Sequence, residues 1–175
     1  METPPFLKSA RFEFERYKTL GDQTLKALTQ EQLHWRPHTT DNSVALLVQH
    51  MAGNMKSRWT NIWTEDGEKP WRKRETEFTV TDLDKAELLA LWESGWDVLF
   101  STMESITKAQ LHQDISIRNE KLTLMAALHR QLAHYAYHVG QMVYLGKMMR
   151  KEQWSSLSIP PGGSEGFNAA LFGRA

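Results

Sequence analysis

Apolar residues recur at three- and four-residue steps over four long stretches of this chain, and each stretch predicts an amphipathic helix. Gly21 interrupts the pattern of the first stretch. Residues that favour a helix N-terminus open the second stretch at Asp41-Asn42-Ser43, and Thr81-Asp82-Leu83-Asp84 opens the third in the form of a capping box. We therefore predict an all-α fold, a four-helix bundle with long helices over these ranges: Pro5 to Leu28, Asp41 to Trp63, Thr81 to Thr107 and Thr123 to Arg150.

The segments outside these helices are polar or irregular. Residues 64–80 break the helical pattern and predict a long loop between the second and third helices, which could reach over the mouth of the bundle. Residues 115–124 alternate apolar and polar positions, as in a small hairpin. Residues 154–164 are rich in Ser, Pro and Gly and predict an irregular tail, with a short turn near Phe167 to Phe172. The apolar residues of this tail favour packing over the bundle or against a second subunit.

The fourth predicted helix has two histidines, His134 and His138, on its apolar face. A buried imidazole needs hydrogen-bond partners, and a shared metal ion would satisfy both rings at once. A single inward histidine is more often a hydrogen-bonded core residue, but two on one inward line are harder to explain in that way. The apolar face that contains them consists of Leu124, Leu128, Tyr135, Val139, Met142, Leu145 and Met149.

The second predicted helix offers a third histidine. His50, Asn54 and Arg58 follow one another at four-residue steps beside its apolar stripe. For Asn54 and Arg58 the simplest interpretation is a boundary between core and solvent, whereas His50 is a candidate third ligand. The chain contains no Cys, so a structural site with four ligands has no obvious fourth residue. His50, His134 and His138 therefore predict an open metal centre of the catalytic kind.

The metal itself is not determined by an all-imidazole ligand set. Such a set suits zinc, nickel, copper or ferrous iron. We expect a divalent metal ion, with zinc as the first choice and nickel, iron or manganese as alternatives. Asn54 and Gln141 lie near the expected ligands and are candidates to orient a histidine or a bound water. Gly140 is expected to let a neighbouring helix come close.

Composition excludes several classes of protein. The 175 residues most simply form one domain, residues 1–175. Lys plus Arg and Asp plus Glu number 21 each, so no overall charge favours nucleic acid or an anionic membrane. Without Cys there are no disulfides and no cysteine nucleophile. The N-terminus lacks the pattern of a signal peptide, and no apolar run is long enough to span a membrane. We therefore expect a cytoplasmic protein.

Two motifs together resemble the DinB/YfiT-like superfamily, whose members are described as metalloenzymes. The first is Asn42-Ser43-x5-Gln49-His50-Met51-Ala52-Gly53-Asn54-x3-Arg58-Trp59, and the second is His134-x3-His138-Val139-Gly140-Gln141. The resemblance spans nearly the whole chain. It implies a four-helix bundle with a divalent metal on His50 of the second helix and on His134 and His138 of the fourth.

The resemblance also implies a class of reaction. Superfamily members with assigned reactions include S-transferases that use bacillithiol and an isomerase that uses mycothiol. Residues 72–78 and 156–160 of this chain look instead like an uncharacterised subgroup. The leading hypothesis is a metal-dependent thiol S-transferase or a related detoxifying enzyme, which acts on a small-molecule substrate such as a low-molecular-weight thiol. The resemblance to the superfamily implies a homodimer, and the apolar tail favours one as well.

The residues that would act on a substrate are less specific than the metal ligands. Arg58, and Arg72 or Arg74 from the long loop, are candidates to bind a carboxylate of the thiol or substrate. Catalytic residues are unassigned, with Arg58, Asn54 and Gln141 as candidates. Two alternatives stay open: a metal-dependent hydrolase, with Glu75 or Glu77 of the loop as a weak candidate base, and a non-catalytic stress-response protein that binds a metal or a small ligand.

Overall fold

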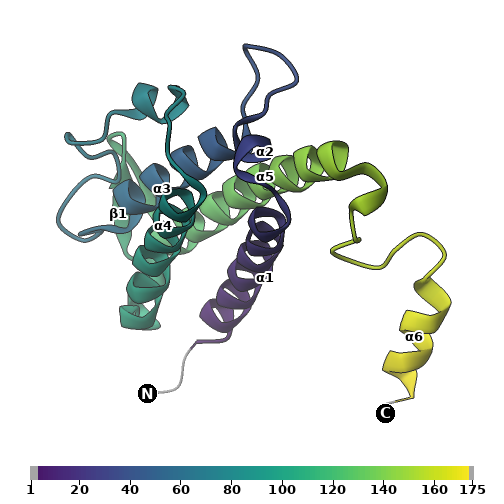
Figure 1. Cartoon of the computed structure of the whole chain (residues 1–175). Helices are drawn as coiled ribbons and strands as arrows, with labels where there is room; N and C mark the ends of the chain where they lie inside the picture. Colours follow the sequence, from purple (N-terminus) through teal and green to yellow (C-terminus); the bar gives the residue numbers. More distant parts are fainter. Residues whose placement is uncertain (1–3, 174–175) are drawn as a thin grey trace.

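The structure is a computed structural model that describes residues 4–173 of the chain. Long helices occupy each of the four predicted stretches (Figure 1). None of the described helices is long and apolar enough to cross a membrane. The prediction that the N-terminus lacks a signal peptide rests partly on residues 1–3, and these residues lie outside the described range. The four long helices are α1 (Pro5–Ala27), α3 (Val44–Trp59), α4 (Lys85–Ser105) and α5 (Leu124–Arg150).

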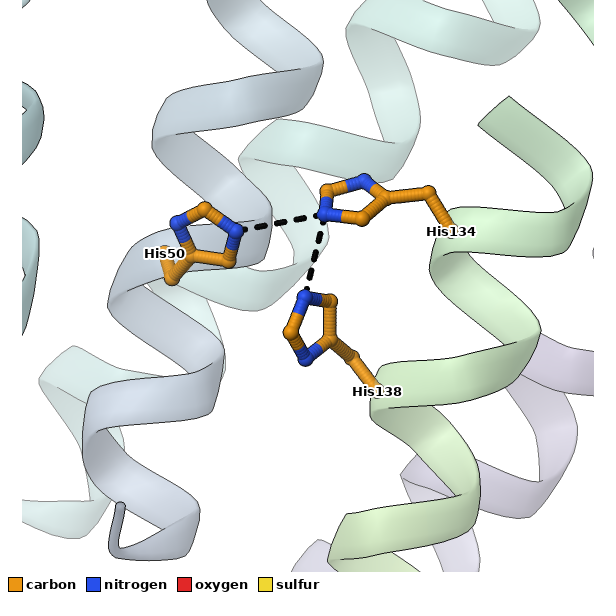
Figure 2. A group of neighbouring side chains, drawn as sticks. All are labelled: His50, His134 and His138. Atoms are coloured by element: carbon orange, nitrogen blue, oxygen red, sulfur yellow. Dashed lines mark hydrogen bonds between the residues drawn. The ribbon is translucent and has the colours of Figure 1, made fainter. Parts of the chain in front are cut away.

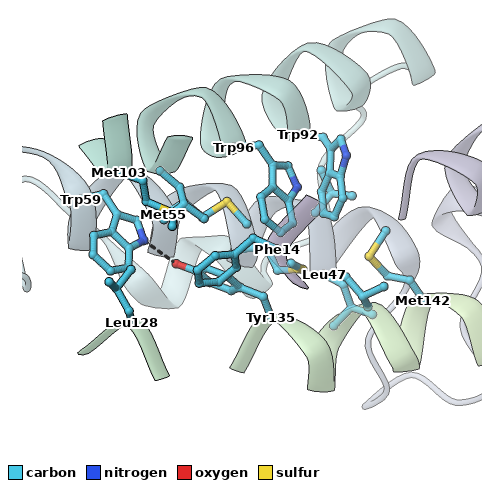
Figure 3. Close-up of a cluster of buried hydrophobic side chains, with 14 of the residues drawn as sticks. Phe14, Leu47, Met55, Trp59, Trp92, Trp96, Met103, Leu128, Tyr135 and Met142 are labelled. Carbon is cyan, nitrogen blue, oxygen red and sulfur yellow. Dashed lines mark hydrogen bonds between the residues drawn. The ribbon is translucent and has the colours of Figure 1, made fainter. Parts of the chain in front are cut away.

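The four long helices enclose a common hydrophobic core. Helix α3 packs along α4 and α1 packs along α5, while α3 also contacts α5 and α1 contacts α4. Figure 3 shows Phe14 of α1, Trp96 of α4 and Tyr135 of α5 meeting in this core, with Phe14–Trp96 and Trp96–Tyr135 ring centroids 6.4 and 5.7 Å apart. Apolar burial of this extent is the main source of stability for such helices. The prediction of a mainly helical protein is confirmed.

Side-chain caps determine where α3 and α4 begin. The Ser43 hydroxyl oxygen accepts a hydrogen bond from the Leu46 N–H at 3.2 Å, as predicted for the start of α3. The cap of α4 is Asp84, whose capping box with Glu87 places the helix start later than the predicted Thr81. Helix α3 also ends at Trp59 rather than at the predicted Trp63, because Asn61 adopts a left-handed backbone with φ of 49°.

The N-terminal third of the chain contains one helix that was predicted and one that was not. Helix α1 runs continuously through Gly21, within the predicted range Pro5 to Leu28, and the missing side chain makes room for a tryptophan: a Cβ would lie 2.7 Å from Cη2 of Trp92. A short helix that was not predicted, α2 (Gln30–His34), follows α1. Its signal in the sequence is a capping box between Thr29 and Gln32.

The connection between α3 and α4, residues 60–84, is held against the predicted hairpin. Strands β1 (Asp114–Ile117) and β2 (Glu120–Thr123) are antiparallel, with Ile115 opposite Leu122. The Asp66 carboxylate accepts hydrogen bonds from the Ser116 hydroxyl and from the N–H groups of Arg118 and Asn119 in the hairpin turn, at 2.6–2.9 Å. These bonds anchor the middle of the connection, which also contains the 3₁₀ helix η1 (Arg74–Phe78). A second 3₁₀ helix, η2 (Ala109–His112), precedes the hairpin.

The C-terminal segment, residues 151–173, follows α5. It begins with the 3₁₀ helix η3 (Lys151–Gln153) and ends with α6 (Ser164–Phe172), so the tail is irregular only in its middle. No residue of this segment is buried. Figure 1 shows α6 standing apart from the long helices. Leu157, Ile159 and Phe167 of α6 line a cavity against Phe12 of α1, so the tail approaches the helices without burying any of its described residues.

Candidate metal centre

Three histidine rings from two helices meet beside the core. His50 lies on α3 and His134 and His138 lie one turn apart on α5, and Figure 2 shows their rings turned toward a common point. The Nε2 atom of His134 is 3.3 Å from Nε2 of His50 and 3.0 Å from Nε2 of His138. All three residues offer ligand atoms within 4.8 Å of one another, so they could hold a metal ion.

These separations match the coordination of a small cation. With Zn–N bonds of about 2.0–2.1 Å, two nitrogens on a tetrahedral metal lie about 3.3 Å apart. The two Nε2–Nε2 distances of 3.0 and 3.3 Å are close to that value. His50 and His138 are only 4% and 8% exposed, so bulk water contributes little to the solvation of their rings.

The outer nitrogens of two rings have hydrogen-bond acceptors that select the tautomer. Nδ1 of His50 donates to Oε2 of Glu77 at 2.9 Å, and Nδ1 of His138 donates to Oε1 of Gln141 at 2.9 Å. A neutral ring that carries its proton on Nδ1 presents a lone pair on Nε2. Both rings therefore direct a lone pair toward Nε2 of His134.

Where the three Nε2 atoms meet, neutral rings cannot satisfy every contact with a hydrogen bond. His134 can supply at most one proton, and its Nδ1 atom is buried without a hydrogen-bond partner. At least one of its two short contacts then joins two lone pairs, which repel each other. A cation at the common point would turn this repulsion into attraction, so the donor set fits a divalent metal.

The surroundings keep two of the rings neutral at physiological pH. Burial, together with the neighbouring His138, His50, Arg58 and Arg72, lowers the pKa of His134 to about 3. Burial also lowers the pKa of His138, although its hydrogen bond with Gln141 acts in the opposite direction. Because neutral imidazole is the form that binds metals, no proton has to leave these two rings for a metal to bind.

Glu77 supports His50 from the α3–α4 connection. Burial alone would raise the pKa of Glu77, but hydrogen bonds from His50 and Arg72 outweigh it and lower the pKa, so the carboxylate is ionised. Arg72 holds both carboxylate oxygens, with Nε–Oε1 and Nη2–Oε2 distances of 2.7 and 2.8 Å. A Cβ at residue 53 would lie 2.8 Å from Cδ of Glu77, so Gly53 leaves the space that this carboxylate occupies.

The other residues predicted for the site have diverse surroundings. Gln141 supports His138, whereas Asn54 accepts a hydrogen bond from the Tyr135 hydroxyl at 3.2 Å. Arg58 is bound to Glu68 and to the backbone oxygen of Gly67. The roles of Asn54, Gln141 and Arg58 toward a substrate stay predictions. The expectation for Gly140 is wrong, because nothing lies within 4 Å of the position its Cβ would take.

A cavity of about 440 Å³ opens onto the three histidines. Sequence reasoning did not assign five of its lining residues to the site: Asn42, Phe78, Arg118 on the hairpin, and Arg130 and Gln131 on α5. Helical spacing could have indicated the last two, which lie four and three residues before His134. Arg118 had no such signal, because only the folded hairpin brings it here. The lining residues are Asn42, His50, Asn54, Arg58, Arg72, Arg74, Phe78, Arg118, Arg130, Gln131, His134 and His138.

Comparison with known proteins places this chain in a family of unknown function. No curated protein matches the chain. Residues 2–163 match the model of a family described as protein of unknown function (DUF1572). The match covers nearly the whole chain, including all three histidines and the α3–α4 connection, and this chain therefore belongs to the DUF1572 family.

Proposed function

We propose that this protein is a divalent-metal-dependent enzyme of the DinB/YfiT-like superfamily, with residues 1–175 forming a single four-helix-bundle domain. His50, His134 and His138 would be the metal ligands. The observation that carries the proposal is the convergence of three Nε2 atoms, with Nε2–Nε2 distances of 3.0 and 3.3 Å to His134. The His-x3-His motif on α5 and the preceding histidine on α3 follow the superfamily pattern.

The proposed reaction is the transfer of a thiol sulfur to an electrophile, as in a thiol S-transferase or a related detoxifying enzyme. A bound divalent cation, zinc as first choice and nickel, iron or manganese as alternatives, lowers the pKa of a coordinated thiol so that thiolate forms near neutral pH. The chain has no Cys, so the sulfur would come from a small-molecule thiol. The cavity of about 440 Å³ is within the usual range for small-molecule sites.

Residues of the chain would orient the ligands and exclude water. Glu77 and Gln141 hold the Nδ1 atoms of His50 and His138, which keeps both Nε2 lone pairs directed inward. Phe78 packs over the His50 ring, with ring centroids 4.7 Å apart, and shields it from solvent. The α3–α4 connection therefore supplies both a polar support and an apolar cover for one ligand.

Transfer is favoured over hydrolysis because the site lacks a free carboxylate base. Both oxygens of Glu77 are bound, Oε1 to Arg72 and Oε2 to His50 and Arg72. The Glu75 side chain is 88% exposed and is paired with Arg74 at the surface. No Asp or Glu lines the cavity among residues 4–173. A metal-activated water would have no protein carboxylate to take its proton.

Metal analysis tests the proposal that the three histidines bind a metal ion. Wild-type protein, purified without an affinity tag after metal-replete growth, is expected to carry close to one metal ion per chain by elemental analysis. His134→Ala should lose it, while His129→Ala, which removes an exposed imidazole from the same helix, should retain it. Metal-free wild type, or equal metal contents in the two variants, would show that the three histidines are not a metal site.

A thiol panel tests the reaction. Metal-loaded protein is mixed with each of several low-molecular-weight thiols and a chromogenic aryl halide, and conjugate formation is followed by absorbance. Metal-dependent conjugation that His134→Ala abolishes would support transfer. Cleavage of ester or amide substrates without conjugation would indicate a hydrolase. If neither reaction occurs although a metal is bound, the result favours the non-catalytic binding protein.

We also propose that the protein forms a homodimer. The support is the exposure of three large apolar side chains on α6, Phe167, Leu171 and Phe172, which are 47%, 48% and 77% exposed. Sedimentation equilibrium of the full chain should give twice the chain mass. A monomer at micromolar concentration would contradict this part of the proposal.

A further inference from the structure

The cavity at the histidine centre has an excess of positive charge. Five arginines line it, Arg58, Arg72, Arg74, Arg118 and Arg130, and no acidic residue lines it among the described residues. Two of the five, Arg58 and Arg72, have side chains only 6% and 2% exposed. A cavity lined by one sign of charge concentrates ligands of the opposite sign.

Four carboxylates, those of Glu68, Glu75, Glu77 and Glu120, pair with these five arginines, so the arginines exceed their carboxylate partners by one charge. Three guanidinium groups converge on the single oxygen Oε2 of Glu68: Arg58 at 3.1 Å, Arg118 at 3.0 Å and Arg72 at 3.5 Å. Glu77 pairs with Arg72 alone among the arginines. Burial lowers the pKa of Arg58, and the charges of Arg72 and Arg118 lower it further although Glu68 acts in the opposite direction. A dication on the histidines would increase the excess of positive charge.

Two of the lining arginines can turn to a ligand at low cost. Arg118 and Arg130 are 55% and 49% exposed, while their partners Glu68 and Glu120 are 26% and 66% exposed. Exposed ion pairs of this kind contribute little to stability, so an entering anion can replace the carboxylate. Gln131, which lies beside Arg130 on α5 and is 3% exposed, has a buried Oε1 atom without a hydrogen-bond partner.

We propose that Arg118 and Arg130 form an anion subsite that binds a carboxylate or phosphate group of the substrate while the substrate's reacting group lies at the histidines. The substrate class is therefore a small organic anion, with an N–H or O–H group that can donate to Gln131. This inference rests on the proposed function for the reacting group, but the subsite itself needs only the arginines. Guanidinium groups bind carboxylate and phosphate with two parallel hydrogen bonds. This assignment replaces Arg58 and Arg72 as the anion-binding residues, because their side chains are buried and already hydrogen-bonded to Glu68 and Glu77.

Charge coupling follows from the same arrangement. A metal ion and five arginines in one cavity repel each other, and a bound anion reduces this repulsion. Metal and anion are therefore expected to bind with positive cooperativity, each raising the affinity for the other by the same factor.

Calorimetric titration of the full-length, metal-free chain at low salt tests the subsite. The probes are inorganic phosphate, succinate and the uncharged succinamide. We expect phosphate or succinate to bind and succinamide not to bind, and the tighter of the two anions identifies the substrate's anionic group. The double variant Arg118→Gln/Arg130→Gln should bind the anion at least tenfold more weakly, whereas Arg16→Gln/Arg11→Gln, which removes two charges from α1, should bind like wild type.

The outcomes separate this inference from the proposed function. Equal anion affinity in the two double variants, or no anion binding by wild type, would overturn the subsite even if the histidines bind metal. Anion binding that persists in His134→Ala would support the subsite even if no metal binds. A repeat with zinc-loaded wild type should show tighter anion binding than the metal-free chain. Unchanged or weaker binding would overturn the expected coupling and, with it, the placement of the anion beside the histidines.

Discussion

Two segments without long helices, the α3–α4 connection at residues 60–84 and the C-terminal segment at residues 151–173, contrast in what they bury. The connection is rich in charge, yet the Lys69 and Arg72 side chains are 0% and 2% exposed. The C-terminal segment has large apolar side chains, yet Phe172 is 77% exposed. Polarity alone therefore does not decide which segment joins the body of the protein.

The difference lies in the partners that each segment meets. In the connection, Asp66 accepts hydrogen bonds from the hairpin and Glu77 binds His50 and Arg72, so buried charges are paired with one another. Pairing of this kind compensates much of the cost of removing charges from water. In α6, by contrast, no residue is buried against the rest of the chain. The connection thereby becomes part of the histidine site, and α6 remains available to another surface.

Glu77→Gln is expected to have the largest effect, because it removes the charged acceptor that holds Nδ1 of His50. Loss of such a supporting carboxylate typically weakens metal binding by about 10–100-fold. Competition with a chromogenic chelator measures the affinity, and Glu75→Gln, at a side chain that is 88% exposed, is the matched control. Equal affinities in the two variants would show that the connection does not support the metal site.

Asp66→Asn tests the anchor between the connection and the hairpin. Asp66 accepts four hydrogen bonds, from the Ser116 hydroxyl and from the N–H groups of Glu68, Arg118 and Asn119. An amide has only one acceptor oxygen, so we expect the free energy of unfolding to fall by about 1–3 kcal/mol at pH 7 in a denaturant titration. Asp82→Asn, at an exposed position, should leave it unchanged. A loss no larger than that of the control would mean that the connection is held elsewhere.

The same residue predicts a dependence on pH. Burial would raise the pKa of Asp66, but its hydrogen bonds outweigh burial and hold the pKa well below the ordinary value of 3.8. A carboxylate with a depressed pKa contributes its stability fully above the unfolded pKa and loses it as the pH falls further. The stability difference between wild type and Asp66→Asn should therefore be constant above about pH 5 and shrink below about pH 4. A difference that grows on acidification would contradict this assignment.

Gly53→Ala should weaken metal binding less than Glu77→Gln, because it displaces the Glu77 carboxylate without removing it. We expect a loss of about tenfold, or about 1.4 kcal/mol. Gly140→Ala is the matched control, since nothing lies within 4 Å of its Cβ position, and it should raise the stability of α5 by about 0.5–1 kcal/mol without changing metal affinity. Chelator competition measures the metal affinity of both variants, and thermal unfolding measures the stability of Gly140→Ala. Unchanged affinity in Gly53→Ala would show that Glu77 can move without consequence.

Phe172→Ser should have the smallest effect on the single chain. The side chain is 77% exposed, so its loss should change the free energy of unfolding by less than about 0.5 kcal/mol at low protein concentration. If the proposed homodimer uses α6, the same substitution should instead weaken self-association, measured by sedimentation. A loss of stability that is large and independent of concentration would show that Phe172 packs within its own chain.

Much of the fold could be predicted because helices have a strong local signal. The four long helices lie within the predicted stretches, Ser43 was one of the three predicted cap residues of α3, and the hairpin lies where it was predicted. One error lies where a neighbour in space acts: α3 ends at Trp59 rather than at Trp63, and the Trp59 carbonyl oxygen accepts a hydrogen bond from the Thr102 hydroxyl of α4.

The sequence by itself determined the helical periodicity, and therefore which face of α5 presents His134 and His138 and which position of α3 presents His50. These depend on spacing along one helix, which is a local property of the backbone. The tertiary structure alone decided that Glu77 supports His50 and that Arg118 enters the same cavity. Both residues reach the site from connections whose path depends on contacts between distant segments. Spacing along the chain carries no information about such contacts, so the convergence of the three histidines was predictable and their surroundings were not.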